Sequence, residues 1–514
     1  MAEEPLKEPF RGELVIGLAG ALGTRLDDLA RQIESVLSRF AFGTSRVRVS
    51  DLVTRFPGWA GTKEKDEAAR IAHLQKVANE IRTASQDGSI LARAAIAAIR
   101  EARAQITGDG SVPGSGHAFL VSQLKHPEEV ALLRSVYGPA FILVAGHAER
   151  GRRVTCLAKQ IAVSLNRSAD VDTFKGKASD LIEADQKSLP EFGQNMQDVF
   201  PLADMFVDLN STGGEYRVER YFDLEFGHPF LTPTPQEVAM YQASAVALRS
   251  SDFNRQVGAA IVQGEDDEAG DVTDVEILAL GMNEVPKAGG GYYWGGESPD
   301  CRDQAGGEER VRQIKVDMLA ELVEKMGDAG LIAANKPVAE LAQDLLPALK
   351  GTRFAAIGEF SRPVHAEVAA IIDAARRGVR IDGGSLFVTT FPCHNCAKHI
   401  IAAGIRKVIY LEPYPKSRAG TLYEEEVCLD AASAGTVPRG AKAISFKVYS
   451  GVAPRKYRTL FSMAERGARQ GLSKEAWELN RGNLRPLHVP PFLHGAYLLA
   501  EAAELEKLKS TRFA

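Results

Sequence analysis

The first part of the chain alternates between short apolar runs and longer segments in which apolar residues recur with the period of a helix. The apolar runs predict buried strands at Glu13–Leu18, Val47–Ser50, His117–Ser122, Ala140–Ala145 and Met205–Leu209. Helices are predicted between them at Leu26–Phe40, Glu67–Thr83 and Pro127–Val136. Because strands that alternate with helices usually run in one direction, this part predicts a parallel sheet covered by helices.

A proline-rich segment, Gly227–Gln236, interrupts this alternation. It contains Pro229, Pro233 and Pro235, and each proline lacks the N–H group that a helix or a sheet would use. We therefore expect a domain boundary here, with one domain over residues 1–230 and a second over residues 236–514.

The second part has an α/β pattern of its own. We predict, in chain order, a helix at about Pro235–Arg249, antiparallel strands at Val257–Val262 and Glu276–Met282, an insertion at about 289–359 with a charged helix near Glu308–Met326, a helix at Val364–Arg377, a strand at Leu386–Thr390, a helix at His394–Ala403 and a strand at Lys407–Leu411. The fold class is therefore α/β in both parts.

Composition limits the classes of function. Of the 514 residues, 45% are hydrophobic and 25% are charged, so the chain has enough apolar surface for sizeable cores and is not a disordered protein. A net charge of -5 disfavours stable binding to nucleic acid. Five cysteines are too few for a disulfide framework, and no apolar run is long enough for a signal peptide or a membrane span. We expect a cytoplasmic protein without a membrane partner.

The strongest chemical signal is a set of metal-binding side chains at the starts of two predicted helices. His365 and Glu367 lie at the start of one helix, and Cys393 and Cys396 lie at the start of the next. Imidazole and thiolate groups bind tetrahedral zinc, and a helix N-terminus favours the thiolate form of cysteine. Three protein ligands leave the fourth position of a catalytic zinc to water, which the ion activates as a nucleophile. We therefore predict His365, Cys393 and Cys396 as ligands of Zn²⁺ and Glu367 as the catalytic proton shuttle.

A structural zinc site is the alternative interpretation, as is a pair of buried thiols beside a capping histidine. A structural site normally has a fourth protein ligand, whereas this sequence offers a glutamate, which favours the catalytic interpretation. The remaining cysteines, Cys156, Cys301 and Cys428, are expected to be ordinary buried thiols. A second metal at Cys301 has no cysteine or histidine nearby at ligand spacing.

The pairing of His-x-Glu with Pro-Cys-x-x-Cys is a signature of zinc nucleobase deaminases. Together with SSDFNRQVGAAIV and LALGMNEVP upstream, VHAEVAAIIDAARRG and LFVTTFPCHNCAKHIIAAGIRKVIYLEPYPKS resemble the deoxycytidylate deaminase branch of the cytidine deaminase superfamily over most of residues 236–450. The resemblance implies a three-layer α/β/α domain. It also implies that Asn283 contacts the sugar of a bound nucleotide and that Lys416 and Ser417 lie near its phosphates. His394 and Tyr423 are further candidates for the pocket, and His394 has the alternative role of capping its helix.

A glycine-rich turn follows the first predicted strand. Gly17, Gly20, Gly23 and Thr24 lie where a phosphate-binding loop would lie, but Leu18 replaces the first glycine and Thr24 replaces the lysine of the G-x-x-x-x-G-K-[ST] pattern. Backbone N–H groups at a helix start can still hold an anion. HAFLVSQLKHPEEVALLRSVYG is similar to the second core strand and helix of P-loop nucleotide kinases, and GRRVTCLAKQ, with Arg152 and Arg153, takes the place of their arginine-bearing segment.

Three interpretations of the first domain follow, namely an active kinase, a degenerate nucleotide-binding regulatory domain and a purely structural domain. The missing lysine favours the regulatory domain, in which Gly17, Gly20, Gly23, Thr24, Arg152 and Arg153 would be the nucleotide-binding residues.

A kinase-like domain ahead of a deoxycytidylate deaminase resembles the bacterial antiviral deoxycytidine nucleotide deaminases. This resemblance implies deamination of dCTP and dCMP to the uracil nucleotides, which would deprive an infecting phage of a DNA precursor. We further expect a homo-oligomer and a regulatory nucleotide at the first domain. A polynucleotide deaminase is an alternative that the negative net charge disfavours, and a nucleotide sensor is an alternative that has no use for Glu367 as a proton shuttle.

Overall fold

The computed structural model describes most of the chain between residues 10 and 511. The segments outside the described residues within this range are 57–63, 65, 187–193, 211–212, 254, 268–270, 306–307, 333–335, 350–351, 353–360, 413–416, 430–442, 464–465, 467–472 and 491–492.

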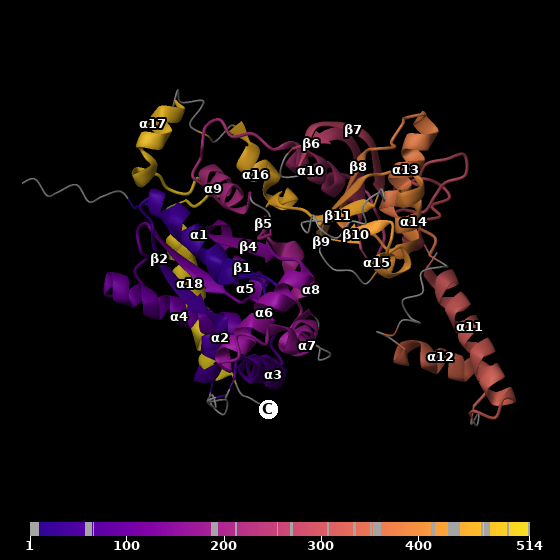
Figure 1. Cartoon of the computed structure of the whole chain (residues 1–514), viewed down its shortest axis with the longest axis horizontal. Coiled ribbons are helices and arrows are strands. Elements are labelled where there is room, and N and C mark those ends of the chain that lie inside the picture. Colours follow the sequence, from indigo (N-terminus) through magenta and orange to yellow (C-terminus); the bar gives the residue numbers. More distant parts are fainter. Residues whose placement is uncertain are drawn as a thin grey trace, which may run out of the picture.

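The chain forms two six-stranded sheets that lie in separate parts of the molecule (Figure 1). The first sheet has the order β12-β5-β4-β1-β3-β2. Its strands are β1 (Glu13–Ala19), β2 (Gly43–Arg48), β3 (His117–Ser122), β4 (Phe141–His147), β5 (Met205–Asp208) and β12 (Gly451–Val452). All its pairs are parallel except that of β12 with β5. The predicted parallel sheet is therefore confirmed.

Strand β2 differs from its predicted position. The apolar run predicts a strand at Val47–Ser50, whereas the strand covers Gly43–Arg48 and a short helix, α2 (Val49–Leu52), follows it. The strand lies at the edge of the sheet, and most of its side chains are not fully buried. An edge strand is held by backbone pairing on one side more than by apolar burial, so its hydrophobic pattern is weak.

Helices pack against the first sheet in two groups. Helices α1 (Leu26–Arg39) and α9 (Gly214–Glu225) contact each other, and α4 (Ile90–Thr107) and α5 (Pro127–Tyr137) form a second group. A separate small apolar cluster joins α3 (Glu67–Ser85), α6 (Arg150–Ser164) and α7 (Lys175–Gln186). A single short turn of helix, α8 (Met196–Val199), leads into β5.

The second sheet has the order β10-β11-β9-β8-β6-β7. Its strands are β6 (Gly258–Asp266), β7 (Val272–Met282), β8 (Ser385–Thr390), β9 (Lys407–Glu412), β10 (Val427–Leu429) and β11 (Ile444–Val448). As predicted, β6 and β7 are antiparallel, while β8, β9, β11 and β10 run parallel to one another. Its helices are α10 (Pro235–Ala247), α13 (Ala366–Arg377), α14 (His394–Ala402) and α15 (Ala419–Leu422).

Alternating side chains assign the two faces of the second sheet to different cores. Ala260 and Phe387 belong to the large core that also contains the first sheet and α10. Their neighbours Ala259 and Leu386 belong to a second core with α13 and α14. Successive side chains of a strand point to opposite faces, so the α/β/α arrangement follows from this period of two.

The insertion forms an arm. Helices α11 (Glu308–Asp328) and α12 (Val338–Ala348) pack on each other around Val316, Leu319 and Ala342, and they project from the body of the molecule (Figure 1). The predicted helix near Glu308–Met326 is thus confirmed.

The end of the chain returns to the first sheet, which the sequence does not anticipate. After β11, the chain adds β12 to the first sheet and continues through α16 (Tyr457–Phe461), α17 (Lys474–Leu479) and α18 (Leu493–Ser510). Helix α18 packs against α4 and α5. The side chain of Arg103 in α4, fully buried, binds Glu13 of β1 and Glu501 of α18.

The segment Gly227–Gln236 joins the two sheets, and a buried ion pair holds its end. Thr234 caps α10, and Glu237 of α10 pairs with Arg220 of α9 at 2.7 Å. The same carboxylate accepts a hydrogen bond from the N–H of Val452 in β12. One glutamate therefore ties the consecutive helices α9 and α10 to β12, whose Val452 lies 215 positions further along the chain.

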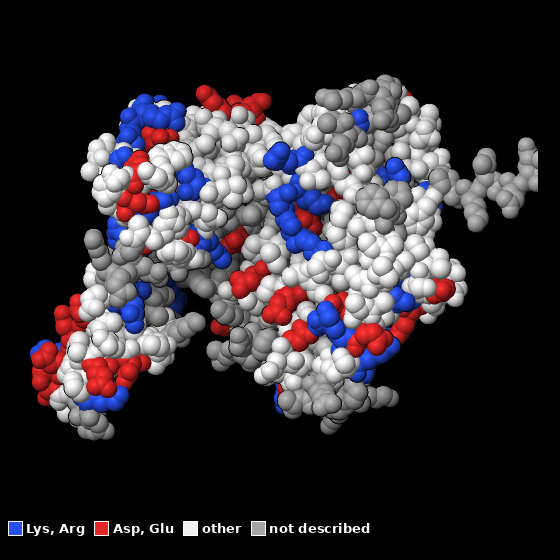
Figure 2. Space-filling view, turned by 180° about the vertical axis from the view of Figure 1, so that it is seen from behind, with Lys and Arg blue, Asp and Glu red and all other residues white. Residues whose placement is uncertain are grey.

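The surface carries charges of both signs. Figure 2 shows basic side chains gathered near the middle of one face, with acidic side chains beside them and on the projecting arm. Among the described residues, no helix combines the length and the apolar composition that crossing a bilayer requires.

Candidate active site

Two helix starts bring the predicted zinc ligands together. His365 is the residue before α13, and Cys393 is the residue before α14, where its sulfur accepts a hydrogen bond from the N–H of Cys396. Both helices pack on the same face of the second sheet, and β8 connects them. Residues that are 28 positions apart thus meet because α13, β8 and α14 form one compact unit.

The distances between the three ligand atoms suit zinc. Nδ1 of His365 lies 3.4 Å from Sγ of Cys393 and 3.3 Å from Sγ of Cys396, and the two sulfurs are 3.6 Å apart. Zinc bonds of about 2.3 Å to sulfur and about 2.0–2.1 Å to nitrogen in a tetrahedron would separate two sulfurs by about 3.8 Å and sulfur from nitrogen by about 3.5 Å. The residues present therefore fit a zinc ion. Among the described residues, the cluster has these three members.

The side chains of the cluster are coupled through a proton. The hydrogen bond with Cys396 lowers the pKa of the Cys393 thiol to about 4, and the hydrogen bond with Cys393 raises the pKa of His365 to about 9, so an ion that binds here displaces the imidazole proton. A thiolate is the form of cysteine that binds metals. The three side chains are thus ligands of the type that zinc takes.

Glu367 lies beside the cluster in the first turn of α13. Its side chain is buried, with 3% of the residue exposed, and the Cys396 thiol is within hydrogen-bonding reach of its carboxylate. Burial raises the pKa of the Glu367 carboxyl above its ordinary value. A buried carboxyl with a raised pKa can hold a proton and release it, which is the property a general acid and base needs.

Asn283 follows β7 and positions the loop before β6. Its side-chain oxygen accepts the N–H of Val257 at 2.7 Å, and its side-chain nitrogen donates to the carbonyl of Arg255 at 2.8 Å. Only 6% of Asn283 is exposed. The structure therefore gives Asn283 a role in fixing this loop, and its predicted contact with a sugar remains a prediction.

The other predicted substrate residues are spread around α14 and α15. His394 is exposed at the start of α14, and Tyr423, half-buried, packs on the core that contains the cluster. Ser417 accepts the N–H of Ala419 and so begins α15. Lys416 lies outside the described residues.

Arg255 is a charged residue near the strand ends that the sequence analysis did not select. Its guanidinium donates to Thr390 at the end of β8 and to Glu412 at the end of β9, at 2.8 Å and 2.5 Å. Burial raises the pKa of Glu412. A half-exposed cation thus lies at the carboxyl ends of the strands that precede α14 and α15, a position that no local motif marks.

Residues 233–412 match a family model described as the cytidine and deoxycytidylate deaminase zinc-binding region. The similarity to this family lies in the C-terminal part of the chain. Similar proteins include the deoxycytidylate deaminase of Enterobacteria phage T4, 47% identical over 57 residues, which are 11% of this chain and 30% of the relative. The deoxycytidylate deaminase of Pongo abelii is 34% identical over 175 residues, which are 34% of this chain and 63% of the relative. The chain thus spans less than two thirds of the length of these relatives.

A solved structure is also similar. The dCMP deaminase from the cyanophage S-TIM5, crystallised in complex with dCMP and dUMP, is 18% identical, with a TM-score of 0.23. The similar part covers 43% of this chain and 100% of that chain.

The predicted phosphate loop lies after β1 in the first sheet. Gly20, Gly23 and Thr24 line a cavity there. Gly23 has a φ of +82°, and a Cβ atom would lie 2.6 Å from the carbonyl oxygen of Arg153. Because glycine alone adopts this conformation without strain and leaves this space, Gly23 shapes the loop.

The remaining three predicted nucleotide-binding residues have different places. Gly17 lies within β1, where a Cβ atom would collide with Leu124 and Phe141, so its role is packing. Arg153 is buried and donates to the carbonyls of Ala148 and Leu22, which holds the loop. Arg152 is exposed. Neither arginine lines the cavity beside the loop.

Lys125 supplies the positive charge that Thr24 does not. It follows β3, and its Nζ donates to the carbonyl of Gly20 at 2.8 Å. The signal in the sequence is a lysine just after the strand that pairs with β1, because the carboxyl ends of parallel strands meet at one edge of a sheet.

Proposed function

We propose that the protein is a zinc-dependent deaminase that hydrolyses free deoxycytidine nucleotides, dCTP or dCMP or both, to the uracil nucleotides and ammonia. The observation that carries this proposal is the buried Glu367 beside a three-ligand cluster whose atoms are spaced for zinc. A closed structural site would instead complete its ligand set with protein atoms.

Each residue then has a defined task. His365, Cys393 and Cys396 would hold the ion, which when bound supplies Lewis-acid activation of water for attack on the cytosine ring. The Glu367 carboxylate would accept one proton of that water and pass it to ring N3 as the hydroxyl group adds to C4 of the cytosine. It would then move the remaining hydroxyl proton to the amino nitrogen, which leaves as ammonia while the C4 carbonyl forms. Burial of Glu367 keeps solvent away from the proton during this transfer.

Two features support free nucleotides as substrates. The net charge is -5, and basic side chains on the face shown in Figure 2 have acidic neighbours, which disfavours a long polynucleotide strand. The deoxycytidylate deaminases among the relatives are named for a mononucleotide. Asn283, His394, Lys416, Ser417 and Tyr423 are the proposed contacts to the nucleotide, and Arg255 is added to them as a cation at the strand ends.

The biological setting is proposed from the resemblance. An enzyme of this kind would act in the cytoplasm as a homo-oligomer and would restrict phage by depleting deoxycytidine nucleotides. Such an activity endangers the host as well, so we propose that the N-terminal, P-loop kinase-like domain regulates it through a bound nucleotide.

A product assay tests the proposed activity. The purified zinc-loaded chain is incubated with dCMP, dCTP and a cytosine-containing single-stranded oligonucleotide, and the products are separated by chromatography. We expect uracil products from one or both nucleotides. Preferential deamination of the oligonucleotide would instead support the polynucleotide alternative.

Two substitutions test the role of Glu367. Glu367→Gln is expected to lower the rate by about 10²–10⁴-fold while the zinc content stays the same, because the carboxylate moves protons and is not a ligand. Glu425→Gln, at an exposed glutamate, is the matched control and should match the parent. A Glu367→Gln variant with full activity would contradict the mechanism.

A further inference from the structure

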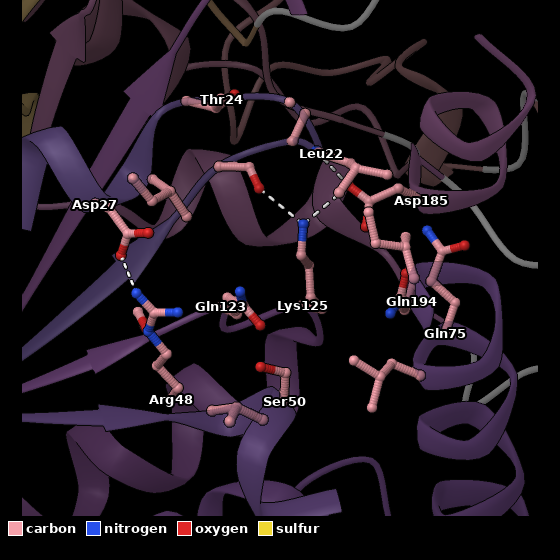
Figure 3. Close-up of a pocket in the computed structure, with 18 of the residues that line it drawn as sticks. Leu22, Thr24, Asp27, Arg48, Ser50, Gln75, Gln123, Lys125, Asp185 and Gln194 are labelled. Carbon is pink, nitrogen blue, oxygen red and sulfur yellow. Dashed lines mark hydrogen bonds and ion pairs between the residues drawn. The ribbon is translucent and has the colours of Figure 1, made fainter. Parts of the chain in front are cut away.

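A cavity of about 470 Å³ lies beside the loop Gly20–Thr24 in the N-terminal part (Figure 3). It is at the carboxyl ends of β1 and β3, next to the point where the strand order reverses between β3 and β4. Open parallel sheets bind ligands at such points, and small-molecule sites have volumes of about 300–1,000 Å³. The position and the size of the cavity therefore suit a small ligand.

One carboxylate oxygen lies where an anion would be bound. Oδ2 of Asp185 accepts the N–H of Leu22 in the loop at 2.7 Å and the ammonium of Lys125 at 2.9 Å (Figure 3). Asp185 is at the end of α7, and its side chain is 2% exposed. A backbone N–H at a strand-to-helix turn and a lysine are the groups that hold phosphate in other proteins. In this conformation, the chain's own carboxylate has that place.

Polar groups without partners face the same cavity. Gln194 borders it with 6% of the residue exposed, and its side-chain oxygen has no hydrogen-bond partner among the described residues. Oγ1 of Thr24 is likewise buried and, within the described part of the chain, unpartnered. Burying a polar atom without a partner costs about 1–3 kcal/mol, so a ligand with donor groups would gain by binding here.

We propose that this cavity binds a nucleoside phosphate, whose phosphate group replaces the Asp185 carboxylate at Leu22 N–H and Lys125 Nζ. The base edge would supply the donor that Gln194 lacks. The inference rests on the proposed regulatory part of the function and gives it a site, a ligand class and a displaced group. No bond is made or broken, because the step exchanges one anion for another.

Helix α7 is the element that this exchange affects. It packs on α3 and α6 through the small cluster of Ala178, Leu181 and Ile182, which is separate from the large core. Helix α7 also contacts α8, and the turn after α8 contacts β9 of the deaminase sheet. Release of Asp185 therefore acts on a helix outside the large core, and contacts through α8 and the turn after it connect this helix to the strand that carries Glu412.

Calorimetric titration of the full zinc-loaded chain tests this site, with thymidine monophosphate and triphosphate as probes that cannot be deaminated. Lys125→Met is expected to weaken binding by about tenfold or more, because a charged hydrogen bond to phosphate is lost. Asp185→Asn is expected to tighten binding, because the competing anion is removed while the shape is kept. Lys76→Met, at an exposed lysine of α3 away from the cavity, is the matched control and should bind like the parent.

Opposite changes in the affinity of Lys125→Met and Asp185→Asn for thymidine nucleotides distinguish a ligand site from a structural ion pair. An ion pair alone predicts lower unfolding temperatures for both variants and no change in binding. Asp185→Asn binding no more tightly than the parent would overturn the proposal, even where Lys125→Met fails to fold. The product assay with dCMP and dCTP is run separately, so absence of deamination and absence of thymidine nucleotide binding are distinct failures.

Discussion

Gly281 sets how closely the helix carrying His365 and Glu367 approaches the second sheet. A Cβ atom at this position would lie 2.2 Å from the carbonyl oxygen of Ala366 and 2.3 Å from the N–H nitrogen of Ala370, both in the backbone of α13. Cβ atoms essentially never lie closer than 3.0 Å to non-bonded heavy atoms of this kind. Gly281→Ala therefore forces the strand and helix apart by about 0.8 Å or more.

This displacement is large compared with the tolerance of a metal site. Zinc–ligand distances hold within about 0.2 Å, and a misplacement of about 1 Å in an active site costs about 10²-fold in rate. We expect Gly281→Ala to lose zinc on dialysis, to deaminate about 10²-fold more slowly and to be destabilised by about 1–3 kcal/mol. Zinc analysis, kcat/KM for dCMP or dCTP, and urea unfolding measure these three effects.

Two other glycines provide matched controls. A Cβ atom at Gly258 would lie 1.9 Å from the carbonyl oxygen of Ala243 in α10, on the opposite face of the sheet, so Gly258→Ala should lose stability but keep its zinc. Gly327 in α11 has open space, so Gly327→Ala should be neutral or stabilising by about 0.5–1 kcal/mol. If Gly281→Ala keeps parental zinc and rate, the contact between β7 and α13 does not position the metal ligands and the reasoning is refuted.

Three further predictions concern the metal, the buried ion cluster and pH. Cys393→Ala should lose zinc and activity together, because two protein ligands hold zinc poorly, and normal zinc content would show the ligand set to be wrong. Arg103→Met removes the guanidinium that pairs with both buried carboxylates, Glu13 and Glu501, so urea unfolding should show a loss of about 3–5 kcal/mol; a loss below about 1 kcal/mol would contradict a buried charge cluster. Burial lowers the pKa of His228 to about 4, so the unfolded chain binds a proton below about pH 6.5 while the folded chain does not. The stability that depends on a neutral His228 is therefore present above pH 6.5 and is lost as the pH falls toward 4. The urea midpoint of His228→Gln should fall less between pH 7 and pH 4.5 than that of the parent.

Much of the fold is encoded locally and was predictable. The strand β3 (His117–Ser122) has the predicted bounds, and α1, α5 and α14 end within one residue of their predicted ends. These elements have strong periodic apolar patterns, and a pattern of this kind has one way to bury its apolar face. The clustering of His365, Cys393 and Cys396 was predictable for a similar reason, since Cys393 and Cys396 are neighbours on one turn and His365 precedes a helix of its own.

Long-range contacts decided the rest, because no local pattern encodes them. Strand β12 has two residues and α18 comes after a long irregular segment, so their return to the first sheet is visible only where Arg103 meets Glu501 and Glu237 meets Val452. In the sequence, Gly281 is an ordinary strand glycine, and only the packing of α13 against it shows that a larger side chain would not fit there.

The N-terminal loop shows the same division most clearly. The sequence by itself determined that a glycine turn without its lysine follows the first strand, and it indicated a defective phosphate loop. The tertiary structure added Lys125 from the neighbouring strand and Asp185 from α7 to that loop. A charge acts across space and not along the chain, so residues that are 60 positions apart can pair beside the loop, and only the packing of β3 and α7 around the loop shows that they do.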